Sequence, residues 1–509
     1  MSMKIEYVGH ACLFIDTGDV KLTTDPWFQG SSYCGQWHIF PRPVNAGVLA
    51  NSEAILISHG HEDHFHEPSL RALPKNAKVL YPYSWYGGAK PFLEQLGFSE
   101  VLEAMPEKCY RLTPNTTITY VANNLDSIIV IESGKKVVVN INDALHSYPT
   151  KIIDVFIRAL KRRWPHIDTV LSGFGGASYF PNTIHCAGKN DVEIAETREQ
   201  LFAHNFCRIV HELKPKVAVP FAADFALLND NQRWINEVRF PRERLAEYYQ
   251  ELYGKDEEVR IEPLYSGDVL IDEKVFRSSP YRDQLRELGV ARLIDRQYGQ
   301  EIAARRTVHP ISDADAESLR LNILENISSR CRLFASDALE QAKFAVKVLD
   351  VPVDNYFNIK FDSQRASVKR AAKPSEDAVL VIETSSEILL HSFGSEWGGD
   401  AITIGYGCEI HIFDSQTVKD GVDITCVRLL TRHPQASRHW KVEPIRVARQ
   451  LLSSQTTRNW VVRAALNRAS EYSETRNNDV MREWLFRSKC EVCRACDLPL
   501  LNEAFAAKL

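Results

Sequence analysis

The segment Ile57-Ser58-His59-Gly60-His61-Glu62-Asp63-His64 is the most informative part of the chain. It places three imidazoles and one carboxylate in the spacing HxHxDH. Both ligand types bind zinc, iron and related metals. The segment follows an expected strand at 54–57 and precedes an expected helix that begins near Pro68, so it forms a loop at a strand end. On such a loop His59 and His61 can face one ion while Asp63 and His64 face another. The alternative is a loop of solvated histidines, which this dense pattern does not favour.

The wider chain has the pattern of an α+β protein. Residues up to about 145 form short segments rich in β-branched and aromatic residues, which predict strands. Apolar residues at helical spacing follow at 151–163 and 193–213. We therefore expect an α+β catalytic unit at 1–275, a helical connector at 276–345, a smaller α+β unit at 346–435 and a helical tail at 436–509.

Composition excludes several classes of protein. Lys plus Arg number 61 against 66 for Asp plus Glu, a net charge of −5, so no nucleic-acid binder is expected. No run of eighteen apolar residues predicts a membrane span, and the first residues lack the apolar core of a signal peptide. The eleven cysteines are an odd number and mostly isolated, which indicates a reducing cytoplasm.

Further motifs accompany the histidine loop. These are Val8-Gly9-His10-Ala11, Asp25-Pro26-Trp27, Gly175-Gly176-Ala177-Ser178 and Pro220-Phe221-Ala222. Together with HxHxDH, their order and spacing resemble the metallo-β-lactamase fold superfamily. Over roughly 1–275 they resemble the branch that holds the catalytic domain of CMP-N-acetylneuraminate hydroxylase and its bacterial relatives. The resemblance implies an αββα sandwich with a dinuclear metal site at the edge of its sheets.

The resemblance also implies a ligand set. Asp143 closes an expected strand where the superfamily has a carboxylate that bridges two metals, although an Asp there could also be an ordinary turn residue. The expected metal ligands are His59, His61, Asp63, His64 and Asp143, with Asp63 and His64 also the candidate catalytic residues. Candidates for supporting or substrate-binding roles are His10, Asp25, Asn123, Gly176, Ser178 and Asp224.

Two departures from the superfamily pattern affect this site. No His occurs at 121–126, where the superfamily supplies a third imidazole to the first metal. A final His is also missing near Pro220, a loss that the hydroxylase branch shares. Asn123 and Asp224 could replace these ligands or hold water, or they could be a turn residue and a surface acid. At least one metal would then keep an open position for substrate, water or dioxygen.

Three functions remain open. The first is a hydrolase of a phosphoryl, acyl or related bond, in which a hydroxide held by zinc or manganese and oriented by Asp63 is the nucleophile. The second is an iron-dependent oxygenase that receives electrons from a separate carrier, because the Rieske ligand pairs of CMP-sialate hydroxylase are absent. The third is a degenerate fold kept as a binding module. We expect the hydrolase, for the sole reason that hydrolysis is widespread in the superfamily that this chain resembles. Its substrate would be a small molecule that can be anionic.

The C-terminal part adds two weaker signals. Cys490, Cys493 and Cys496 have the spacing CxxCxxC, which could hold an iron–sulfur cluster or zinc, but a fourth ligand is missing. Reduced structural thiols are the preferred interpretation. The segment 389–405 loosely resembles sterol-carrier-like domains and could form a small apolar pocket or an oligomer contact.

Overall fold

The computed structural model describes residues 2–83, 89–122, 126–146, 150–176, 182–186, 188, 190–256, 258–395, 397–432, 444–459 and 461. The predicted Asn123, Ser178, Cys490, Cys493 and Cys496 lie outside these residues. Within the described residues, no helix is long and apolar enough to cross a membrane.

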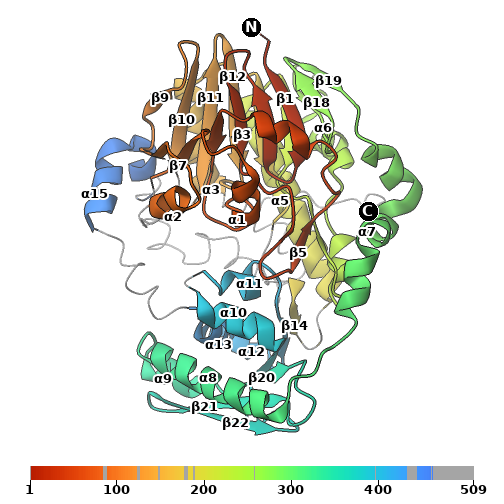
Figure 1. Cartoon of the computed structure of the whole chain (residues 1–509), viewed down its shortest axis with the longest axis vertical. Helices are drawn as coiled ribbons and strands as arrows, with labels where there is room; N and C mark the ends of the chain where they lie inside the picture. Colours follow the sequence, from red (N-terminus) through yellow and green to blue (C-terminus); the bar gives the residue numbers. More distant parts are fainter. Residues whose placement is uncertain are drawn as a thin grey trace.

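Two β-sheets lie face to face in the N-terminal part (Figure 1). The first has the order β19 (Lys274–Phe276), β18 (Val269–Ile271), β1 (Lys4–Gly9), β2 (Cys12–Asp16), β3 (Lys21–Thr24), β6 (Ala54–Leu56), β7 (Lys78–Pro82) and β8 (Val101–Ala104). The second has the order β17 (Arg260–Ile261), β15 (Val217–Phe221), β13 (Thr169–Gly173), β12 (Lys136–Asn142), β11 (Ser127–Ser133), β10 (Thr116–Ala122) and β9 (Cys109–Arg111).

Apolar side chains fill the space between these sheets. Alternate residues of β1 and β2, such as Ile5 and Leu13, pack in one cluster with Ile118, Ile129 and Val138 of the second sheet. Because successive strand residues point to opposite faces, the remaining apolar residues of each sheet need cover from helices. Both sheets are therefore apolar on both faces.

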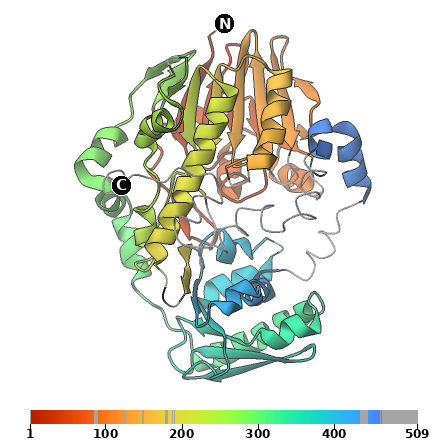
Figure 2. The same cartoon turned by 180° about the vertical axis from the view of Figure 1, so that it is seen from behind.

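Helices cover the two outer faces. The first sheet packs against η1 (Ala46–Asn51), α1 (Glu67–Ala72) and α2 (Ala89–Gln95). The second packs against α3 (Thr150–Arg163), α5 (Asp191–Leu213) and α6 (Leu245–Tyr253), of which α5 is the long yellow helix in Figure 2. The predicted α+β class and the αββα sandwich are confirmed.

Parallel strands bring several loops to one edge of the sandwich. β3, β6 and β7 are parallel neighbours in the first sheet, and β12, β13 and β15 are parallel neighbours in the second. The carboxyl ends of these strands, and the turn between β1 and β2, therefore meet at the edge that faces the C-terminal part (Figure 1). This edge carries the histidine loop.

A third sheet lies beyond that edge. Its order is β14 (Ile184–Cys186), β24 (Glu409–Ile412), β23 (Leu380–Thr384), β20 (Phe344–Val348), β21 (Tyr356–Asp362) and β22 (Arg365–Ala371). The accompanying helices are α8 (Asp313–Cys331), α9 (Ser336–Gln341), α10 (Ser386–Gly394), α11 (Asp400–Thr403), α12 (Gln416–Lys419) and α13 (Val422–Thr431).

The remaining elements join these parts. A small sheet has the order β16 (Phe225–Leu227), β5 (Trp37–Ile39) and β4 (Ser31–Ser32). The helical elements outside the three main groups are η2 (Arg233–Asn236), η3 (Arg242–Arg244), α7 (Tyr281–Arg305) and α15 (Pro444–Ser453). The predicted division of the chain into four units stays a prediction, and β14 shows that the first of them supplies a strand to the third sheet.

An ion-pair cluster supports the junction at β14. The imidazole of His185 donates from Nδ1 to Asp191 at 2.8 Å and from Nε2 to Glu409 at 2.5 Å. These hydrogen bonds to Asp191 and Glu409 raise the pKa of His185 to about 10. Burial raises the pKa of Glu409, while its contact with His185 acts in the opposite direction. The charged form of His185 therefore helps to hold β14 beside β24 in the third sheet.

We expect His185→Gln to lower the melting temperature in a pH-dependent way. A raised pKa contributes stability that is complete below the unfolded value of about 6.5 and is lost as the pH rises through about 10. The difference between wild type and variant should therefore be largest near pH 6 and close to zero above pH 10. Thermal unfolding at a series of pH values measures it. His211→Gln is the matched control, because its ring stacks on Tyr253. A difference that does not change with pH would contradict this role.

Candidate metal centre

Asp25 positions the histidine loop. It follows β3, adjacent to β6, and its backbone has a left-handed φ of 37°. Its Oδ1 accepts a hydrogen bond from the Ser58 backbone N–H at 2.7 Å, and its Oδ2 accepts one from the Ser58 hydroxyl at 2.8 Å. The same hydroxyl oxygen lies 2.9 Å from Nδ1 of His59. Asp25 thus fixes the start of the loop and, through Ser58, the ring of His59.

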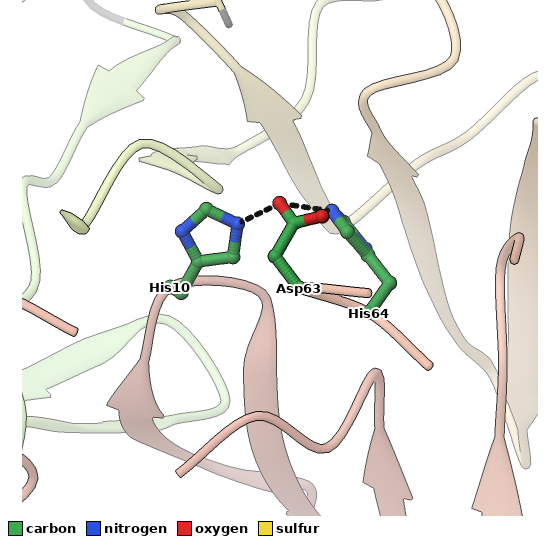
Figure 3. A group of neighbouring side chains, drawn as sticks. All are labelled: His10, Asp63 and His64. Carbon is green, nitrogen blue, oxygen red and sulfur yellow. Dashed lines mark hydrogen bonds and ion pairs between the residues drawn. The ribbon is translucent and has the colours of Figure 1, made fainter. Parts of the chain in front are cut away.

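Three groups of donor atoms lie together at this edge. One group is His59, His61 and Asp126, the second is His59, His64 and Asp143, and the third is His10, Asp63 and His64. In each group the donor atoms all lie within 4.8 Å of one another. Figure 3 shows the third group, in which the carboxylate of Asp63 lies between the two imidazole rings.

Three carboxylates converge on His64, which is fully buried. Its Nδ1 lies 3.1 Å from Asp25, and its Nε2 lies 3.3 Å from Asp143 and 3.5 Å from Asp63. Burial by itself would lower the pKa of His64, but the three carboxylates hold it well above the ordinary value. The raised pKa of His64 therefore reflects the negative charge gathered around it, which a bound metal would also balance.

Asp63 is held as a charged carboxylate. Its Oδ1 accepts a hydrogen bond from the Tyr33 hydroxyl at 2.5 Å, and its Oδ2 lies 2.9 Å from Nε2 of His10. Burial raises the pKa of a carboxyl group, but the charge of His64 and the contact with His10 hold the pKa of Asp63 well below its usual range. Burial and the charge of Asp63 raise the pKa of Tyr33, so its phenol keeps its proton.

The pKa values of Asp126 and His59 are shifted toward the neutral form of each side chain, unlike those of Asp63 and His64. Oδ1 of Asp126 lies 3.8 Å from Nε2 of His59, and that nitrogen lies 2.8 Å from Nδ1 of His61. Burial raises the pKa of Asp126. Burial and the neighbouring His64 and His61 keep the pKa of His59 well below its ordinary value, so its imidazole is neutral. A neutral imidazole is the form that binds a metal.

The donor set fits a metal. Among the described residues, Nε2 of His64 and Oδ1 of Asp143 are buried in this cluster without a hydrogen-bond partner. Buried polar atoms are normally satisfied, so such atoms in one cluster indicate a missing partner. A divalent cation that accepts imidazole nitrogen and carboxylate oxygen would satisfy these atoms and neutralise the acids.

A cavity of about 140 Å³ opens onto the cluster. Its wall includes His61, Asp63, Asp126 and Asp143 on one side. The other lining residues are His10, Tyr33, Trp37, His146, Gly175, Gly176, Arg198, Phe202, Ala222, Phe225 and Ile404. Ile404 follows α11, so the C-terminal part helps to close the site. Burial raises the pKa of the nearby Asp400, on α11 itself, to about 6.

Most predicted site residues meet in this cluster. His59, His61, Asp63, His64 and Asp143 fall into the three donor groups, and His10 joins them. Gly176 lines the cavity, and Asp25 contacts His64.

Asp224 lies elsewhere. It is buried, forms an ion pair with Arg242 and accepts a 2.5 Å hydrogen bond from Tyr7. Its place is in the wall of a neighbouring cavity of about 420 Å³, outside the three donor groups. The structure thus commits both of its oxygens to other residues of the chain, and the alternative of a surface acid is wrong.

Asp126 and His146 also lie at the site and were not predicted from the sequence. Asp126 directly precedes β11, in the segment 121–126, where it is a possible ligand beside Asn123. Nδ1 of His146 donates to the Asp143 carbonyl at 2.7 Å, and its ring packs on Phe202. Its spacing of three residues from Asp143 was the available signal.

We expect Asp25→Asn to weaken metal binding by about 10- to 100-fold, because the amide cannot accept from Ser58 and His64 together. The loss of a buried acceptor should also lower the free energy of unfolding by about 1–3 kcal/mol. Metal titration and urea unfolding measure the two effects. Asp268→Asn is the matched control, because this buried carboxylate pairs with Arg282 outside the cluster. It should lose stability while keeping its metal affinity. Equal metal affinity in Asp25→Asn and wild type would contradict the positioning role.

Comparison with known proteins agrees with this geometry. Residues 4–150 match the family model described as "Beta-lactamase superfamily domain". The cytidine monophosphate-N-acetylneuraminic acid hydroxylase of Danio rerio is 25% identical over 257 residues, which are 46% of this chain and 40% of that protein. The chain thus matches less than half the length of this relative.

Two solved structures are similar to part of this chain. CmlA, a diiron β-hydroxylase from Streptomyces venezuelae, is 20% identical with a TM-score of 0.35, over 54% of each chain. Igni18, a metallo hydrolase from Ignicoccus hospitalis, is 16% identical with a TM-score of 0.34, over 53% of this chain and 98% of that one. The predicted resemblance to the metallo-β-lactamase fold superfamily, on the branch of the CMP-N-acetylneuraminate hydroxylases, is confirmed for the N-terminal part of the chain.

Proposed function

We propose that the chain is an iron-dependent oxygenase that hydroxylates a small-molecule substrate. The observation that carries this proposal is the group of His59, His61 and Asp126. Two imidazoles and one carboxylate with open positions are typical of non-haem iron oxygenases. The similarity to a hydroxylase over 46% of the chain supports the same chemistry. It reverses the order expected from the sequence, in which the hydrolase came first.

The three donor groups support a proposal with two ions. His59, His61 and Asp126 would hold the first, and His64 and Asp63 the second. Asp143 lies within reach of both His59 and His64, so it is the candidate for a shared ligand. When bound there, iron supplies the redox chemistry toward dioxygen that no amino-acid side chain offers.

Two side chains of the chain itself, Tyr33 and His10, contact the carboxylate of Asp63. The Tyr33 hydroxyl and Nε2 of His10 both point at its carboxylate, so its orientation and charge are set before substrate binds. Trp27, Trp37 and Phe225 pack around the ring of His10. This aromatic packing keeps water from the Asp63 side of the cluster and strengthens its electrostatic interactions.

The balance of the reaction requires an electron donor. Hydroxylation of a C–H bond consumes one dioxygen, two electrons and two protons, and it yields the alcohol and one water. A separate electron carrier is therefore part of the proposal. The cysteines at 490–496 would be an internal source only if they held a cluster, and they lie outside the described residues.

Hydrolysis is the second candidate. Two imidazoles and a carboxylate also form catalytic zinc sites, where the metal activates water. The superfamily match at residues 4–150 supports this alternative. The identity of the metal distinguishes the two functions, because zinc has no redox chemistry.

We expect protein loaded anaerobically with ferrous iron to consume dioxygen when it is reduced, and zinc-loaded protein to consume none. An oxygen electrode and metal analysis measure this. Asp126→Asn should lower iron affinity by at least ~10-fold and suppress oxygen uptake, because the first ion loses its only carboxylate that is not shared. Asp154→Asn, which alters a carboxylate paired with Arg208 on the outer helices, should behave as wild type.

Retention of zinc in preference to iron, together with cleavage of phosphoryl or acyl model esters, would contradict the oxygenase. That result would support the hydrolase instead. Wild-type iron affinity and oxygen uptake in Asp126→Asn would show that Asp126 is not a metal ligand.

A further inference from the structure

Arg198 brings a permanent positive charge to the wall of the metal cavity. It lies in α5, is only 1% exposed, and lines the same cavity as Asp63, Asp126 and Asp143. A guanidinium group has five N–H donors, and burying it is costly unless acceptors meet them. The contacts of Arg198 therefore indicate whether it is a structural residue.

Within the described part of the chain, those contacts are few. Nη1 of Arg198 donates to the Tyr406 hydroxyl at 3.4 Å, and Nε has no hydrogen-bond partner. The guanidinium lies 4.9 Å from the centroid of the Phe202 ring. Glu199 interacts with it electrostatically, but burial raises the pKa of that carboxyl group to about 7. Arg198 is thus not fully neutralised by a carboxylate of its own.

Arg242 shows what a satisfied buried arginine looks like in this fold. It is 8% exposed, forms an ion pair with Asp224, and donates from Nη1 to the Leu264 carbonyl at 2.6 Å. These strong acceptors meet its charge and its donors. The contrast shows that, among the described residues, Arg198 has no acceptor as strong as those of Arg242, so its donors are available to a ligand.

The backbone at Gly176 makes room for this arginine. A Cβ atom there would lie 2.4 Å from the Phe202 ring and 3.1 Å from Nη2 of Arg198. Gly176 therefore lets the loop after β13 pass close to both side chains, and it lines the cavity with them. The cavity, at about 140 Å³, is smaller than the ~300–1,000 Å³ of pockets for drug-sized ligands, so it fits a compact group.

We propose that Arg198 binds a compact oxyanion of the substrate, a carboxylate or a phosphate group, in the metal cavity. The planar guanidinium can donate two parallel hydrogen bonds to such a group. Asp63, Asp126 and Asp143 line the same cavity as candidate metal ligands, so the arginine would hold the substrate at a second point, separate from the metals. The inference rests on the proposed metal-dependent function, because it assigns the anion to the substrate of that reaction.

The test titrates metal-loaded protein with acetate and with inorganic phosphate by calorimetry. We expect Arg198→Met to bind the preferred anion about 10- to 100-fold more weakly than wild type, with unchanged metal content. Arg198→Lys keeps the charge without the planar fork and should show a smaller loss. Arg208→Met is the matched control on the same helix, because Arg208 pairs with Asp154 and does not line the cavity. The anion with the larger dependence on Arg198 identifies the group as carboxylate or phosphate.

Equal anion affinities in wild type and Arg198→Met, with full metal content in both, would overturn the inference and leave the proposed function intact. Absence of bound metal from all four proteins would instead overturn the proposed function, while Arg198-dependent anion binding would still support the anion site. If thermal unfolding shows that Arg198→Met does not fold, the Lys variant decides. An anion affinity in Arg198→Lys equal to that of wild type would then overturn the proposal that the guanidinium group of Arg198 donates two parallel hydrogen bonds to the anion.

Discussion

Buried negative charge around His64 is the constraint on which the candidate centre depends. Asp25, Asp63 and Asp143 lie within 3.1–3.5 Å of its two nitrogens, and one imidazolium can balance only one of the three charges. Burying unpaired charges is expensive, so a cluster of this kind needs further cations. Two divalent metals, held as proposed above, would meet that need, and His64 would then bind one of them as a neutral imidazole.

The fold brings these charged side chains together at one edge of the sandwich. Parallel strands bring Asp25, the histidine loop and Asp143 from separate positions in the sequence to one edge of the sandwich. Ser58 links Asp25 to the histidine loop, because its N–H and its hydroxyl both donate hydrogen bonds to the Asp25 carboxylate. Ile404 of the C-terminal part covers this edge, and the pairing of β14 with β24 connects the C-terminal part to the N-terminal part. The centre is therefore enclosed by segments more than two hundred residues apart.

The sequence could predict the parts of this site that are local. HxHxDH is contiguous, and Asp143 directly follows a segment rich in β-branched residues, so these residues could be found without a structure. Asp126 could not be chosen over Asn123 by pattern, because only the packing of β11 beside the loop brings its oxygen to 3.8 Å from His59. Asp224 was a reasonable ligand candidate until tertiary structure showed its partner Arg242. Pairings across the chain, such as His185 with Glu409, depend on long-range contacts that periodicity does not report.

Anomalous diffraction from crystals of iron-loaded protein would show whether the histidine–aspartate cluster binds metal. We expect anomalous peaks at about 2.0–2.2 Å from the ring nitrogens of His59 and His61 and from a carboxylate oxygen of Asp126, with a second peak beside His64 and Asp143. Protein with full iron content but no anomalous peak among these side chains would contradict this expectation.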